Sequence, residues 1–100
     1  MPKILTKKFI FMVKLNKISS SLWDFTLYKN SDGNYVIKVM FSEGEYKVDV
    51  ARFFVFHENE IKNPQQINEV KVFSEEIRDN YVLYLQREIS KIDFDEMLDK

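Results

Sequence analysis

Residues 23–41 read WDFTLYKNSDGNYVIKVMF, and this stretch decides the fold because it places two alternating segments on either side of a turn. In each segment an apolar residue occupies every second position, which is the period of a β-strand with one buried face. The side chains expected to face the core are Trp23, Phe25, Leu27, Tyr35, Ile37, Val39 and Phe41. Residues 30–34 contain Asn, Asp and Gly, which tolerate the positive φ angles of a tight turn. The stretch therefore predicts a β-hairpin.

The same alternation extends the sheet on both sides of this hairpin. Residues 8–15 predict a first strand, and the serines at residues 19–21 predict the turn that follows it. A turn at residues 42–45 leads into a fourth strand. The side chains expected to face inward are Phe9, Phe11, Val13 and Leu15 in the first strand, and Tyr46, Val48 and Val50 in the fourth. Short turns between consecutive strands predict an antiparallel meander.

Residues 51–56 break the alternation, because apolar side chains occur there on both faces. One interpretation is a strand with a β-bulge near Ala51, which would turn Phe53 and Val55 inward. The other is a short helix that begins with Asp49 as its N-cap. Aromatic and β-branched residues dominate the segment, which favours the strand.

Beyond residue 74 the apolar residues recur at three- and four-residue spacing, the pattern of a helix with one buried face. The apolar stripe consists of Ile77, Tyr81, Tyr84, Leu85 and Ile89. Ser74 is the expected N-cap, and the two glutamates after it lie where the helix dipole favours negative charge. A helix is therefore predicted over residues 75–91. Residues 69–73 fit either a brief fifth strand or the start of this helix.

The last residues complete the predicted fold class. Residues 93–96 read DFDE and resemble a capping box, which predicts a short final helix through Leu98. The length of 100 residues allows one domain, spanning residues 1–100. We predict an α+β domain with a four- or five-stranded antiparallel meander sheet, a C-terminal α-helix packed on one face and a short final helix.

Composition excludes several classes of site and partner. The chain has no cysteine, which rules out disulfides, thiolate metal sites and cysteine nucleophiles. No apolar run approaches the ~18 residues of a membrane span, so we expect a cytoplasmic protein with no membrane partner. The net charge is −1, which gives no general attraction to nucleic acid. The charge is unevenly spread, because residues 1–29 hold six lysines and one aspartate, a net +5.

The sequence contains few residue patterns that are typical of catalytic or metal sites. Both glycines lie in predicted turns, so no phosphate-binding loop is present. His57 is the only histidine, and with Glu58 and Glu60 it lacks the further ligands that a zinc or iron site needs. The acidic tail, consisting of Asp93, Asp95, Glu96 and Asp99, lacks the calcium-loop pattern and is explained by helix capping. We expect a non-enzymatic protein without a metal or other cofactor.

The sheet face opposite the aromatic one is the candidate binding surface. It combines apolar and lysine side chains, and apolar patches rimmed by charge mark interaction sites. The candidate residues are Lys8, Ile10, Met12, Lys14, Tyr28, Val36, Lys38 and Met40. Alternatively, the N-terminal segment, the long loop or the final short helix covers this face.

We therefore expect a small protein-interaction module: an adaptor, an inhibitor- or immunity-type partner, or a homodimer. A second hypothesis is single-stranded nucleic-acid binding, in which lysines of the same face contact phosphate and Tyr28 stacks on a base. The net charge of −1 and the scarcity of arginine oppose this second hypothesis.

Overall fold

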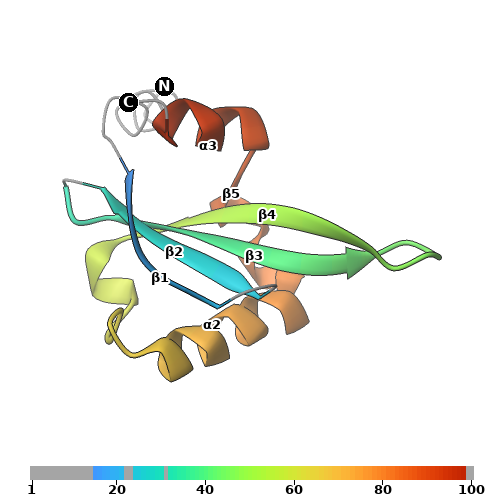
Figure 1. Ribbon diagram of the computed structural model, residues 1–100, viewed down its shortest axis with the longest axis horizontal. Helices are drawn as coiled ribbons and strands as arrows, with labels where there is room; N and C mark the ends of the chain where they lie inside the picture. The colour runs from blue at the N-terminus through green and yellow to red at the C-terminus, as the bar shows by residue number, and fades with distance from the viewer. Residues whose placement is uncertain (1–14, 22–23, 31, 99–100) are drawn as a thin grey trace.

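A five-stranded sheet organises the computed structural model, which describes residues 15–21, 24–30 and 32–98 (Figure 1). The strands are β1 (Leu15–Ser21), β2 (Phe25–Asn30), β3 (Tyr35–Glu43), β4 (Val48–Phe56) and β5 (Glu88–Ile89). They lie in sequence order, and every neighbouring pair is antiparallel. The predicted meander and the α+β class are therefore confirmed.

Two helices cover opposite faces of this sheet (Figure 1). Helix α2 (Ile67–Asp79) packs with the 3₁₀ segment η2 (Tyr81–Arg87) on one face, and α3 (Lys91–Leu98) packs on the other. The first core includes Phe25, Leu27, Ile37, Val39, Phe54, Phe56, Val70 and Ile77. The second core consists of Leu15, Val36, Phe53, Ile89, Phe94 and Met97. The molecule therefore has three layers rather than a sheet with one open face.

The central hairpin has the predicted inward residues and the predicted turn. Phe25 lies opposite Val39, and Leu27 lies opposite Ile37, with all four side chains buried. In the turn, the Asn30 Oδ1 atom accepts hydrogen bonds from the backbone N–H groups of residues 32 and 34. Gly33 has a φ angle of 89°, the left-handed conformation that favours glycine.

Strand β4 is regular, so the predicted bulge near Ala51 is wrong. Its register with β3 runs without interruption from Tyr35 opposite Phe56 to Glu43 opposite Val48. Phe54 and Phe56 belong to the first core, whereas Phe53 belongs to the second. The apolar residues on both faces need no change of phase, because each face is covered by a helix.

The β3–β4 hairpin ends in a turn at residues 44–47, later than the predicted turn at 42–45. Gly44 and Lys47 both have positive φ angles there. Tyr46 and Val48 are exposed, so their predicted inward orientation is wrong. The reason is that the hairpin extends beyond the part of the sheet that α2 covers (Figure 1).

Strand β1 also differs from its prediction. Residues 19–21 belong to β1 and pair with β2, so the serine turn predicted there is wrong. The register shifts between Lys17 and Ser19, and Leu15 lies in the second core instead of the first. The other residues of the predicted first strand, 8–14, and Trp23 lie outside the described residues.

The helix predicted over residues 75–91 begins earlier and ends earlier, as α2. Residues 69–73 are its first turns rather than a strand. Ser74 is not an N-cap: it is buried within the helix, and its hydroxyl donates a hydrogen bond to the Lys71 carbonyl oxygen at 2.7 Å. After Asn80 the chain tightens into η2, and Ile89 lies in β5. The three-residue spacing of the predicted stripe fits both a helix and a 3₁₀ segment, which explains the overextension.

The short final helix is confirmed as α3. It begins at Lys91, before the predicted capping box. The Ser90 hydroxyl oxygen accepts the backbone N–H of Asp93 at 3.1 Å, so serine supplies the capping oxygen. Phe94 and Met97 point into the second core.

Candidate functional site

Helix α3 covers much of the sheet face that the sequence singled out as a binding surface. Val36 is only 1% exposed, because it packs in the second core. The ring of Tyr28 meets Phe94 edge-on at 5.1 Å, and burial raises the pKa of its hydroxyl. Lys38 and Met40 are half-buried. Lys8, Ile10, Met12 and Lys14 lie outside the described residues. The structure therefore does not assemble an open surface from the four candidates that it describes.

The 3₁₀ segment η2 instead presents exposed apolar side chains. With three residues per turn, Tyr81, Tyr84 and Arg87 align on one side of it and are half-buried. The residues between them are exposed. Val82 is 76% exposed, Leu83 74% and Leu85 49%. The sequence pattern placed Leu85 in the buried stripe of a helix, so it did not reveal the patch.

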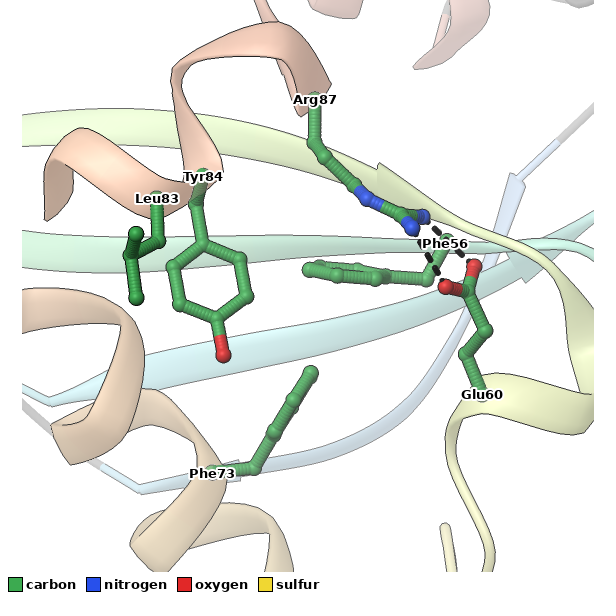
Figure 2. Close-up of a pocket in the computed structure, with 6 residues that line it drawn as sticks. All are labelled: Phe56, Glu60, Phe73, Leu83, Tyr84 and Arg87. Carbon is green, nitrogen blue, oxygen red and sulfur yellow. Dashed lines mark hydrogen bonds and ion pairs between the residues drawn. The ribbon is translucent and has the colours of Figure 1, made fainter. Parts of the chain in front are cut away.

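A pocket of about 300 Å³ lies beside this patch (Figure 2). It is lined by Phe56, Glu60, Phe73, Leu83, Tyr84 and Arg87. These side chains come from the end of β4, the 3₁₀ turn η1 (Glu58–Glu60), α2 and η2. The three rings meet edge to face, with centroids 5.0 Å apart for Phe56 and Phe73 and 6.4 Å apart for Phe73 and Tyr84. This edge-to-face geometry holds the pocket wall in place.

An ion pair closes one side of the pocket. The Arg87 guanidinium donates to the Glu60 carboxylate at 2.6 Å and lies 4.9 Å from the centroid of the Phe56 ring (Figure 2). The hydrogen bond from Arg87 lowers the pKa of Glu60, and the charge stays on the carboxylate. Glu60 and Arg87 therefore neutralise each other's charge.

A second carboxylate, that of Glu76, contacts the pocket lining through Tyr84. The Tyr84 hydroxyl donates to the Glu76 Oε2 atom at 2.9 Å, and burial followed by this bond raises the pKa of Tyr84. The Asn80 amide donates to the other oxygen of Glu76. One turn before Phe73, Glu69 accepts a hydrogen bond from the amide of Asn63. In the described part of the chain, neither Glu69 nor Glu76 pairs with a cation.

A second polar cluster, around Arg52, lies on the same side of the sheet. The Arg52 guanidinium uses Nε and Nη2 to bind Glu43 and Nη1 to bind Glu88, at 2.8–3.0 Å. The Cζ atom of this guanidinium lies 4.9 Å from the Tyr81 ring centroid. The Tyr81 hydroxyl donates a hydrogen bond to Glu88 at 2.6 Å. Because its groups are bound to one another, this cluster ties the β3–β4 hairpin to η2 and β5.

The residues considered for metal binding do not converge. Among residues 15–21, 24–30 and 32–98, no three His, Cys, Asp or Glu side chains lie close enough to hold an ion. Glu60 is paired with Arg87, and Asp95 with Lys91 at 2.9 Å. In the same residues, no helix has both the length and the apolar character to span a bilayer.

The sequence matches no protein-family profile, and neither a curated protein nor a solved structure is significantly similar to it. The candidate site is therefore defined by its geometry alone. It consists of an open pocket with aromatic residues, an exposed apolar patch, and two carboxylates that have no cationic partner among the described residues.

Proposed function

We propose that this chain is a non-enzymatic protein-interaction module that binds its partner with η2 and the adjoining pocket. The observation that carries the proposal is the exposure of Val82, Leu83 and Leu85 next to a pocket walled by aromatic rings. Apolar patches with charged rims mark interaction sites, and the side chains enriched at interface centres are aromatic residues and arginine.

The chemistry of the pocket supports recognition rather than catalysis. Its two charged lining residues, Glu60 and Arg87, are bound to each other, and its remaining polar group is the Tyr84 hydroxyl. A reaction needs an acid, a base or a nucleophile that is free to meet the substrate. The lining supports a role in binding an apolar group.

This proposal moves the binding surface away from the sheet face. The ring of Tyr28, which the nucleic-acid hypothesis requires for stacking, packs against Phe94. Val36 is buried by the same helix. The exposed apolar side chains of η2 support protein binding there more directly.

Affinity purification from the native host with two matched variants tests this proposal. Leu83→Glu places a charge in the patch, and Ile92→Glu places one on α3, where Ile92 is 72% exposed. We expect one stoichiometric partner to accompany the wild type and Ile92→Glu but not Leu83→Glu. Thermal unfolding checks that both variants fold. If the same partner accompanies Leu83→Glu, or if none accompanies the wild type, the proposal is wrong.

A further inference from the structure

The size of the pocket limits what the partner places in it. At about 300 Å³ it lies at the lower end of the roughly 300–1,000 Å³ range of small-molecule sites. Its lining combines the rings of Phe56, Phe73 and Tyr84 with Leu83 and the Glu60–Arg87 ion pair. A pocket of this size and lining fits one large apolar side chain of a partner rather than a bulky cofactor.

Helix α2 gives the surroundings of the pocket a negative charge. Both cations in its middle and last turns, Lys71 and Arg78, reach Asp24 at 3.5 and 3.8 Å. Phe73, which lines the pocket, has Glu69 four residues before it and Glu76 three residues after it. Positions with these spacings share one face of a helix. The cations of α2 are thus drawn to Asp24, whereas two of its four carboxylates, Glu69 and Glu76, lie on the helix face that carries Phe73.

Neither of these two carboxylates has a counterion among the described residues. Glu69 accepts from Asn63 at 2.8 Å, and Glu76 accepts from Tyr84 and Asn80, all of which are neutral donors. Glu60 and Arg87, the two charged residues of the lining, neutralise each other, so the negative charge near the pocket comes from Glu69 and Glu76 beside Phe73. Complementary charge at a rim raises the association rate and selects the partner.

The tip of the β3–β4 hairpin of a second copy does not match this rim. Two further exposed apolar side chains, Tyr46 and Val48, lie at that tip. Glu45 and Asp49 flank them, against one lysine, Lys47. An acidic tip would approach an acidic rim, and like charges at an interface disfavour the complex.

We infer, given the proposed function, that the partner is a protein segment that inserts one large apolar side chain into this pocket and carries lysine or arginine on either side of it. The apolar side chain packs on Phe56, Phe73 and Tyr84. The flanking cations lie beside Glu69 and Glu76 and supply the charge that the described residues do not.

Selection from a random peptide display library on the immobilised full-length chain tests the inference. We expect the selected peptides to combine a large apolar residue with neighbouring Lys or Arg, and to lose binding to Leu83→Glu. Their affinity falls as salt rises, because the Debye length shortens from about 8 Å at physiological salt to about 3 Å at 1 M.

A charge-neutral double variant separates the rim from the pocket. Glu69→Gln/Glu76→Gln keeps an oxygen for the Asn63 and Tyr84 donors and removes both charges. We expect roughly a threefold loss of affinity per charge and about tenfold together. The control, Glu45→Gln/Glu96→Gln, removes the same charge from exposed positions on the hairpin tip and α3 and leaves affinity unchanged.

The outcomes distinguish this inference from the proposed function. Peptides that bind through Leu83 but show no basic preference, or that bind the Gln variant equally well, overturn the inference and leave the proposed function standing. Light scattering that shows a dimer dissolved by Leu83→Glu also overturns it, because the occupant is then a second copy. Peptides indifferent to Leu83→Glu, or no selected peptide, contradict both.

Discussion

Gly33 and Gly44 share a left-handed backbone but have different neighbours. Their φ angles are 89° and 81°. A Cβ atom on Gly33 would collide with the Glu58 Oε2 atom, whereas one on Gly44 would meet nothing within 4 Å. We expect Gly44→Ala to lower the free energy of unfolding by about 1 kcal/mol through backbone strain alone. Gly33→Ala should lose several tenths more, because the Glu58 side chain must move. Urea denaturation measures both, and an equal or larger loss for Gly44→Ala would contradict this account.

The Glu60–Arg87 ion pair makes stability depend on pH. The pKa of Glu60 is lowered in the folded state, so its contribution is complete above the ordinary glutamate pKa of 4.5 and disappears as pH falls through the lowered value. Both side chains are about one-third exposed, which limits the contribution to about 1 kcal/mol or less. We expect Glu60→Gln to be less stable than the wild type near neutral pH. Urea denaturation should show this difference shrinking as the pH falls below the ordinary glutamate pKa and through the lowered one. A difference that is constant with pH would show that the charge is irrelevant.

Single residues also show where sequence reasoning succeeds. Asn30, Gly33 and the alternating residues beside them were predictable, because a tight turn and its strands depend on neighbours in sequence. Val36 was not, because a valine on the outer side of a strand fits an exposed face and a covered face equally well. Its burial depends on α3, more than fifty residues away along the chain.

At the scale of elements, α3 owes its position to a few buried contacts. Phe94 stacks on Phe53 with ring centroids 4.1 Å apart and meets Tyr28 edge-on. We expect Phe94→Ala to lower the free energy of unfolding by about 3 kcal/mol, since it opens a cavity in the second core. Ile92→Ala, on the exposed side of the same helix, should change it by less than about 0.5 kcal/mol. Chemical denaturation compares the two, and equal losses would mean that α3 does not pack on the sheet as described.

The boundary between α2 and η2 marks the limit of pattern-based prediction. Ile77, Tyr81 and Tyr84 contribute to or pack against the first core, as the predicted stripe required. Leu85 is 49% exposed, so its predicted inward orientation is wrong. The backbone that places them changes from α-helix to 3₁₀ after Asp79. The sequence pattern does not reveal this change, because both structures bring residues three apart to one side. The residues between Tyr81 and Tyr84 are Val82 and Leu83, which belong to the candidate binding patch. The site was therefore missed by the same step that overextended the helix.

At the scale of the molecule, the sheet has one core on each face. The aromatic face was predicted as the core under the helix, which the burial of Phe25, Ile37 and Ile77 confirms. Coverage of the other face by the final short helix was one of the alternatives, and α3 confirms it. The second core changes where a partner would bind, because α3 and β5 supply residues that pack on the outer sides of β3 and β4. What remains open beside a pocket is η2, on the opposite side of the sheet from α3 (Figure 1).

The location of binding is the central claim, and amide chemical shifts test it most directly. The isotope-labelled full-length chain is titrated with a peptide selected on it, and its NMR spectrum is followed. We predict the largest shift changes at Phe56, Glu60, Phe73 and residues 81–87, with residues 91–98 of α3 unchanged. Largest changes at α3, or at Lys38 and Met40 on the sheet face, would contradict the claim that η2 and its pocket are the binding surface.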